Sequence, residues 1–275
     1  EDQGTPVWRV FTRADGLTSN SVRSIDEDSY GGLWFSTEAG LTRFDGLWQS
    51  FTQREGLPSD GAVGVVEETP GVVWVATDAG VSRLTSDLDG RWGVNMPVNG
   101  SLPVGVTGLA LARDGLSSAV WAGTDRGLYR WSGTAWGVYA GLIGAPIRRM
   151  AVDVEGVLWC VNDGTADHRP ALNRIAASDA DPDVFELTGQ AAGRSINDLL
   201  PVGGGQWWLA TSEGILFFDG EWSALDAPPG IPAVHALGRR AGAGAIWAAT
   251  DAGLYVLDAT WTVLGVDDGL PSDSV

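Results

Sequence analysis

The sequence has no lysine, a single cysteine and no long run of apolar residues. All 17 basic side chains are arginine, against 35 acidic ones, so the formal net charge is −18. Nucleic acid and anionic membrane surfaces are disfavoured as partners, because phosphate contacts need a basic surface. No segment approaches the roughly 20 apolar residues that span a bilayer, so we predict no membrane-spanning segment. Cys160 alone cannot form an internal disulfide.

Residues suited to metal binding and nucleophilic catalysis are scarce as well. With two histidines and one cysteine, a zinc site would need carboxylate ligands. The sequence contains no Gly-x-Ser-x-Gly elbow, Walker loop or dinucleotide fingerprint in a strand-to-helix context. Cys160 has apolar neighbours and is expected to be an inert core thiol. We therefore predict no metal, no cofactor and no enzymatic activity.

Tryptophan, in contrast, is abundant and recurs with a period. Six short apolar segments each centre on one tryptophan, here called the anchor: Trp34, Trp74, Trp121, Trp159, Trp208 and Trp247. Successive anchors are 40, 47, 38, 49 and 39 residues apart, a spacing typical of four-stranded propeller blades. A second set recurs at the start of the outer, fourth strand: Trp8, Trp48, Trp92, Trp136, Trp222 and Trp261. The tryptophans are thus expected to pack blades together rather than to form a sugar-binding surface.

Alternation and turn residues divide the first unit into four strands, at residues 21–28, 33–37, 41–44 and 47–52. We predict an all-β fold, a β-propeller of four-stranded blades, as one domain over residues 1–275. Six blades are readable in the sequence. Their expected limits are approximately 13–52, 53–97, 98–140, 141–188, 189–226 and 227–266.

Residues 15–45 read DGLTSNSVRSIDEDSYGGLWFSTEAGLTRFD. This pattern resembles the two-component-regulator propeller repeat, and the resemblance extends over essentially the whole chain. It is stronger for units one, two, three and six than for units four and five. The resemblance implies an extracytoplasmic sensor propeller of a bacterial signalling protein, although the family also has free-standing members.

The two ends of the chain repeat each other. Residues 268–275 nearly repeat residues 15–22, and residues 261–264 repeat residues 8–11. The chain therefore has six copies of the first three strands but seven of the outer strand and its crossing loop. Segments 7–12 and 261–275 are the duplicates. Two interpretations stay open: six blades that close with one outer strand left over, or an excerpt from a seven-bladed or longer array.

The residue after the first apolar position of each inner strand varies among the units. These residues are Arg23, Gly64, Thr107, Arg148, Asn197 and His235. We expect these residues at the mouth of the propeller channel. A position that only packs blades together would keep one residue type in every unit, whereas a ligand-binding position can vary. Arg23, Arg148 with Arg149, Asn197 and His235 are therefore candidates to bind a polar or anionic small ligand. Solvated rim residues are the alternative.

Unit four carries a six-residue insertion between its second and third strands. It lies within residues 164–170 and includes His168 and Arg169. Inserted loops on rigid scaffolds commonly carry binding function, so both residues join the candidate site. A tolerated surface insertion is the alternative.

Two further columns are charged. The turns between second and third strands carry an acidic rim: Glu38, Asp78, Asp125, Asp163, Glu213 and Asp251. Such a rim can bind a cation or a basic partner, although acidic residues also suit these turns. Four third strands carry arginine, namely Arg43, Arg83, Arg130 and Arg174. Each arginine is expected to pair with a carboxylate of the repeat.

These observations predict a non-enzymatic sensing or binding module that recognises a polar small molecule or another protein at the channel mouth. The resemblance implies a periplasmic or cell-surface location. One alternative is a structural docking propeller in a cell-surface assembly. A second is a propeller lyase acting on a carboxylate-containing substrate, with His168 or His235 as the base and arginine neutralising the carboxylate.

Overall fold

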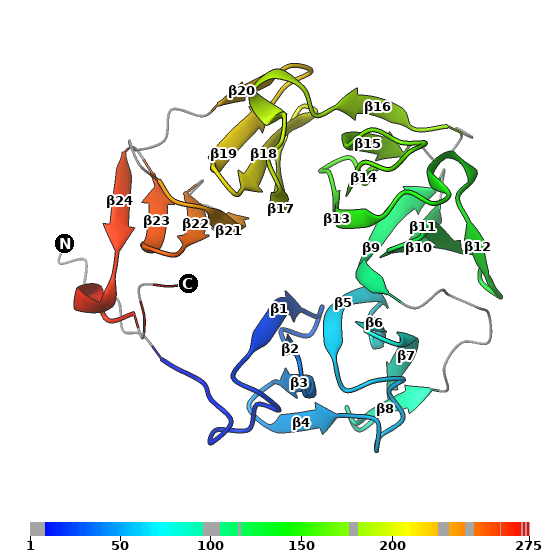
Figure 1. Cartoon of the computed structure of the whole chain (residues 1–275). Helices are drawn as coiled ribbons and strands as arrows, with labels where there is room; N and C mark the ends of the chain where they lie inside the picture. Colours follow the sequence, from blue (N-terminus) through cyan, green and yellow to red (C-terminus); the bar gives the residue numbers. More distant parts are fainter. Residues whose placement is uncertain are drawn as a thin grey trace. The chain divides into compact units, whose positions relative to one another are not determined.

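The structure is a computed structural model of the chain. It describes residues 9–95, 105–114, 117–175, 181–224, 231–239, 245–258, 260–270, 272 and 274. These residues form six four-stranded antiparallel sheets and three short 3-10 helices (Figure 1). The chain is an all-β protein of six propeller blades, which confirms the predicted fold class.

The blades fall into two compact units. The four-blade unit, Phe11–Glu186, holds blades 1 to 4, and the two-blade unit, Glu1–Val10 with Leu187–Val275, holds blades 5 and 6. Blades 1 and 2 are β1 (Val22–Glu27), β2 (Leu33–Thr37), β3 (Gly40–Phe44) and β4 (Trp48–Phe51), then β5 (Ala62–Thr69), β6 (Val72–Thr77), β7 (Gly80–Ser86) and β8 (Trp92–Asn95). Blades 3 and 4 are β9 (Val106–Asp114), β10 (Ser117–Thr124), β11 (Gly127–Trp131) and β12 (Trp136–Val138), then β13 (Ile147–Val152), β14 (Leu158–Asn162), β15 (Ala171–Ile175) and β16 (Asp183–Glu186).

The two-blade unit repeats the same order. Its strands are β17 (Ile196–Gly203), β18 (Gln206–Thr211), β19 (Gly214–Phe218), β20 (Trp222–Ala224), β21 (Val234–Arg239), β22 (Ile246–Thr250), β23 (Gly253–Leu257) and β24 (Trp261–Leu264). The 3-10 helices are η1 (Ala140–Leu142), η2 (Gly189–Ala191) and η3 (Val266–Asp268). In every blade the strands pair in sequence order as an antiparallel meander.

The tight turn between the second and third strands has its own buried hydrogen bond. In blade 1 the Thr37 hydroxyl donates to the carbonyl oxygen of Gly40 at 2.8 Å. Gly40 has φ of +140°, a backbone conformation that glycine adopts without the steric cost of a Cβ. Threonines at the same position make this bond in four other blades: Thr77, Thr124, Thr211 and Thr250.

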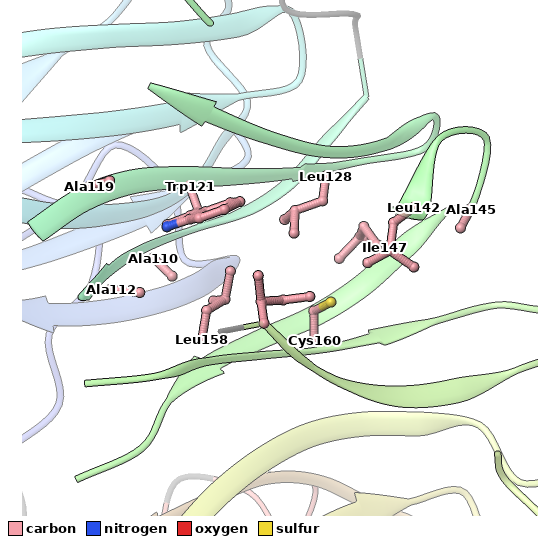
Figure 2. Packing of buried hydrophobic residues seen from close by; sticks show 11 residues of the cluster. Ala110, Ala112, Ala119, Trp121, Leu128, Leu142, Ala145, Ile147, Leu158 and Cys160 are labelled. Atoms are coloured by element: carbon pink, nitrogen blue, oxygen red, sulfur yellow. The ribbon is translucent and has the colours of Figure 1, made fainter. Parts of the chain in front are cut away.

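Within each unit, neighbouring blades pack face to face through a tryptophan pair or an apolar cluster. The ring of Trp92 in blade 2 meets the anchor Trp34 of blade 1 edge-on at 4.9 Å, and Trp136 of blade 3 meets Trp74 of blade 2 at 5.6 Å. Between blades 3 and 4, Trp121 packs with Ile147 and other buried side chains (Figure 2). The described tryptophans of these clusters therefore pack blades together, as predicted; Trp8 lies outside the described residues.

A buried carboxylate organises blade 1. The Oδ2 atom of Asp28 accepts hydrogen bonds from the Trp34 indole at 2.9 Å and from Arg43 Nε at 2.7 Å. Its Oδ1 atom accepts the backbone N–H of Gly32 at 2.8 Å. Asp28 and Arg43 are only 4% and 5% exposed. Burial opposes ionisation of Asp28, but the hydrogen bonds from Arg43, Gly32 and Trp34 outweigh it and hold the pKa of Asp28 below its ordinary value of 3.8.

The same cluster recurs with variations. In blade 2, Glu68 accepts hydrogen bonds from the Trp74 indole at 3.0 Å and from Arg83 at 3.2 Å. In blade 4, Asp153 accepts the Trp159 indole at 2.9 Å, and Arg174 pairs instead with Asp183 at 3.2 Å. These pairs confirm the predicted pairing of Arg43, Arg83 and Arg174 with carboxylates.

Blade 3 departs from this arrangement. Among the described residues, the indole nitrogen of Trp121 is buried without a hydrogen-bond partner. The guanidinium of Arg130 lies over the Trp121 ring, 5.9 Å from its centroid. Blade 3 therefore retains the arginine of the repeat, and the contact described for it is a cation–π contact with the anchor tryptophan.

Replacing Arg43 by methionine should lower the free energy of unfolding by about 3–5 kcal/mol, because it leaves the Asp28 carboxylate buried without its cation. The matched control is Arg174→Met, whose pair with Asp183 is substantially exposed and should contribute only about 0–1 kcal/mol. Urea unfolding followed by tryptophan fluorescence measures both variants. Equal losses for the two variants would contradict a special role for the buried cluster.

Candidate functional site

Every inner strand begins with a one-residue β-bulge at the same place. In blade 1, Val22 pairs with Thr37 and Ser24 with Ser36, which leaves Arg23 as the extra residue. The bulged residues of the six blades are Arg23, Val63, Thr107, Arg148, Asn197 and His235. A bulge breaks the alternation of a strand and redirects one side chain. The variable column that the sequence analysis singled out is therefore a structural feature of the repeat.

One member of this column was assigned wrongly. Gly64 is the residue that the sequence predicts for blade 2, but Ala62 pairs with Thr77 and Gly64 with Ala76, so the bulged residue is Val63. The alignment counted from the more obviously apolar Val63. The small Ala62, which is fully buried, is the equivalent of Val22.

In the four-blade unit the inner strands β1, β5, β9 and β13 lie side by side (Figure 1). Their bulges lie at the end of each sheet that carries the turn between the second and third strands, because the inner strand begins where the second strand ends. Blade 1 contributes Arg23 to this end, and blade 4 contributes Arg148 and Arg149. The two-blade unit presents Asn197 and His235 at the equivalent end of its own sheets.

The candidate cations pair with the predicted acidic rim. Arg23 of blade 1 donates to Asp78 of blade 2 at 3.0 Å, and Arg148 donates to Asp163 of its own blade. In the two-blade unit, His235 Nε2 lies 2.9 Å from Asp251 Oδ1. Three residues of the bulge column thus each pair with one carboxylate of the acidic rim.

The remaining positions have different partners. Asn197 donates to the backbone carbonyl of Val234, the first inner-strand residue of the next blade, at 2.8 Å. Glu38 accepts a hydrogen bond from the Ser19 hydroxyl at 3.1 Å. Glu213 lies 3.6 Å from Arg194. Within the described ranges, no group of three or more His, Cys, Asp or Glu side chains is placed to hold a metal ion.

The inserted loop of blade 4 is held at several points. His168 Nε2 lies 3.1 Å from the carbonyl oxygen of Ile143, in the crossing loop that precedes the blade. Arg169 pairs with Glu186 at 2.8 Å. Asn162, which replaces the turn threonine of the other blades, donates to the carbonyl oxygens of Asp163 and Arg169.

A second asparagine, Asn173, holds the side chain of Asn162 in place. The Asn173 amide, on β15, donates to Asn162 Oδ1 at 2.7 Å, and both side chains are buried. The insertion therefore has a defined conformation, and it brings His168 and Arg169 to the same blade as Arg148 and Arg149.

Two carboxylates that the sequence analysis did not single out join neighbouring inner strands. Asp26 Oδ2 accepts the Ser24 hydroxyl at 2.7 Å and the backbone N–H of Val65, in blade 2, at 3.3 Å. Burial raises the pKa of Asp26 above its ordinary value, against the effect of these two hydrogen bonds. Asp198 likewise accepts the N–H of Leu237 at 2.8 Å.

Residues 16–39 match the family model described as a two component regulator propeller. The chain carries this propeller repeat. Its predicted resemblance to the family is therefore confirmed. A histidine kinase P4 of Formosa agariphila is 48% identical to the chain over 40 residues, which cover 14% of this chain and 3% of the kinase.

Solved structures with the same fold come from sensor and surface proteins. The extracellular domain of a protein described as a hybrid two-component system of B. thetaiotaomicron, BT3049, superposes with a TM-score of 0.73 at 19% identity. The match covers 97% of this chain and 38% of that domain. PorZ, a surface component of the type-IX secretion system of Porphyromonas gingivalis, has a TM-score of 0.69 at 15% identity, over 98% of this chain and 44% of PorZ. This propeller thus spans less than half the length of both proteins.

A propeller enzyme has the same fold. Virginiamycin B lyase of Staphylococcus aureus has a TM-score of 0.66 at 17% identity, over 90% of this chain and 86% of the lyase. At such identities the likeness concerns the fold and not the chemistry. Across the part of the propeller that the structure describes, no helix combines the length and the apolar character needed to cross a membrane.

Cys160 provides a test of how firmly blade 4 is packed against blade 3. It lies in the cluster of Trp121, Leu158 and Ile147 and is fully buried (Figure 2). Burial raises the pKa of its thiol to about 12. At pH 8 the folded protein should react with a thiol reagent at least about a hundredfold more slowly than the urea-unfolded protein, because reaction needs both opening and ionisation. A Cys160→Ser variant sets the background, and equal rates in the two states would contradict this packing.

Proposed function

We propose that this chain is a non-enzymatic binding or sensing propeller of a bacterial signalling or cell-surface protein, located outside the cytoplasm. It recognises a polar, anionic small molecule or a partner protein through one end of the four-blade unit, where the inner-strand bulges and the turns between second and third strands lie. The recognition residues are Arg23, Arg148, Arg149, His168 and Arg169. Asn197 and His235 serve the equivalent role on the two-blade unit.

The observation that carries this proposal is the bulge column. Six blades share one backbone irregularity, yet its side chain changes from arginine to valine, threonine, asparagine or histidine. A position that only packed blades together would keep one residue type, as the anchor tryptophan does. A sensing role is supported by the match of residues 16–39 to the family model and by the 40-residue likeness to the histidine kinase. The extracellular domain described above has the same fold.

The ion pairs at this end are suited to exchange. The Arg148 and Asp163 side chains are 56% and 41% exposed, and exposed pairs contribute only about 0–1 kcal/mol each. A carboxylate or phosphate of a ligand can therefore replace Asp163 at the guanidinium at little cost and form a charge-assisted, bidentate hydrogen bond. The chain is strongly acidic overall, and the arginines at this end give an anion a local cationic site.

A thermal-shift screen of acidic sugars, amino acids and inorganic phosphate tests the small-molecule proposal. A ligand at one hundred times its Kd should stabilise the fold by about 2.7 kcal/mol, which is readily measured as a rise in Tm. Arg148→Ala should weaken the affinity about tenfold or more, since a hydrogen bond to a charged group contributes about 1.5–3 kcal/mol. Arg91→Ala, in the exposed turn between β7 and β8, is the matched control and should leave the affinity unchanged.

The docking alternative gives a different result in the same experiment. A propeller that only docks in a surface assembly, as the fold of PorZ illustrates, should show no saturable shift with any of these compounds. Arg148→Ala would then also behave as the wild type in partner signalling. That combination would overturn the small-molecule proposal.

The lyase alternative has one observation in its favour, the His235–Asp251 pair at 2.9 Å. A carboxylate held against a histidine can orient it as a general base. We nevertheless expect no cleavage of quinupristin by the wild-type chain in a mass-spectrometric assay. Cleavage that disappears in the His168→Ala, His235→Ala double variant would establish the lyase instead, whereas cleavage that persists would exclude both histidines as the base.

A further inference from the structure

One residue of each inner strand directs its backbone N–H to the free edge of the sheet. It is the residue that pairs with the position after the anchor tryptophan. In blades 2 to 6 these residues, here called the donor column, are Val65, Leu109, Met150, Leu199 and Leu237. The N–H of Val65 donates to Asp26 of the preceding blade at 3.3 Å, and not to the second strand. Because hydrogen-bonded and non-hydrogen-bonded pairs alternate along an antiparallel ladder, the whole column has this orientation.

Asp198 shows how one carboxylate serves the donor columns of two blades. Its Oδ1 atom accepts the N–H of Leu199, in its own blade 5, at 2.9 Å. Its Oδ2 atom accepts the N–H of Leu237, in blade 6, at 2.8 Å. A single carboxylate beside the inner strand therefore bridges two neighbouring blades.

Blade 3 has a glycine at the place of this carboxylate. Gly108 pairs with the residue two positions after its anchor, as Asp198 does. Its neighbours in the donor column are Leu109, in the same blade, and Met150, in blade 4. Ala110 holds the position that Asp26 has in blade 1. The two positions that supply carboxylates in other blades thus carry no acceptor side chain in blade 3.

Neither backbone conformation nor packing requires this glycine. Gly108 lacks a positive φ, and among the described residues a Cβ built on it would meet only Met150 Cε, at 3.9 Å. Gly123, its partner on β10, is different, because a Cβ there would come within 2.8 Å of Ile147. Glycine weakens a strand interior and often marks a place where a ligand approaches the backbone closely.

Positive charge lies beside the same donors. Arg148 and Arg149 directly precede Met150 on β13, and both side chains are exposed. An anion held at the N–H of Met150 is therefore close in sequence to two guanidinium groups, which favour a carboxylate over a neutral acceptor.

We propose that the free edge of inner strands β9 and β13 binds the carboxylate of a small ligand at Gly108. One carboxylate oxygen accepts the N–H of Leu109 and the other accepts the N–H of Met150, as the oxygens of Asp198 do in blades 5 and 6. The missing side chain of Gly108 leaves the place of the carboxylate open. This assignment rests on the proposed function, because it names carboxylates as the ligand class and adds two backbone donors to the arginines.

The Met150 N–H can be observed by itself, because the chain has only 2 methionines. When the full chain is labelled with ¹⁵N at methionine alone, the backbone amide signal that disappears in Met150→Leu belongs to Met150. We expect glutarate to move this amide proton downfield in a saturable manner, since the N–H gains a charged acceptor. The neutral analogue glutaramide, and sodium chloride at matched ionic strength, should leave the signal in place.

Gly108→Asp supplies the carboxylate from within the chain. The Met150 amide proton should then lie downfield without ligand, and the affinity for glutarate should fall about tenfold or more, because the place is filled and a like charge is added. Gly137→Asp is the matched control. It adds the same charge to outer strand β12 of the same blade, where a Cβ would meet nothing within 4 Å, and it should bind glutarate as the wild type does.

A Met150 amide that glutarate leaves in place up to its solubility overturns the proposal, and this result needs no variant to fold. A shift of the same size and affinity in Gly108→Asp also overturns it, because the ligand then binds elsewhere. Tm in the same samples separates this failure from that of the proposed function. If glutarate raises Tm, Arg148→Ala removes the rise and the Met150 amide does not move, recognition by arginine stands and only the backbone site falls. If none of the acidic compounds raises Tm or moves the amide, both fall.

Discussion

The packing of blades 1, 2 and 4 depends on a carboxylate that accepts the indole N–H of the anchor tryptophan, and in blade 1 this carboxylate is buried. A tryptophan contributes a large apolar surface to a blade interface, but its N–H cannot be buried without cost unless an acceptor lies beside it. Asp28 supplies that acceptor in blade 1, and Arg43 neutralises the charge that the acceptor introduces. The carboxylate also accepts the N–H of Gly32 and so closes the turn between the first two strands.

This arrangement joins secondary structure to the packing of neighbouring blades. Arg43 lies under the Trp92 ring of blade 2, 5.3 Å from its centroid, as well as beside Trp34. The cation that compensates Asp28 therefore also contacts the next blade. Where the repeat has diverged, as at Trp121, the aromatic contact with arginine remains while the described residues offer the indole no acceptor. In blade 3 the arginine–ring contact is thus present without the carboxylate that accompanies it in blade 1.

The sequence predicted the fold well because the same four-stranded blade occurs six times, and the anchor tryptophans mark the period of the repeat. It predicted the arginine pairs for the same reason. It misplaced Gly64, because Val63 is the more obviously apolar residue and the small, buried Ala62 is the one that begins the strand. The Arg23–Asp78 pair joins residues 55 positions apart, and no local pattern indicates such a contact. The hydrogen bonds from Asn162 to the inserted loop could not be predicted either, because they go to backbone carbonyl oxygens.

The position of the bulge has a consequence for how such a propeller diversifies. The bulged residue takes no part in the pairing register that its neighbours share, so its side chain can change while the ladder on either side is preserved. The anchors and their carboxylates lie elsewhere in each blade, so the bulged side chains can be changed one blade at a time without altering them. The six bulged positions can therefore carry different side chains while the strand pairing of the blades stays the same. If these six positions were randomised together, most variants would fold, and few of them would present the same set of side chains at this end of the blades.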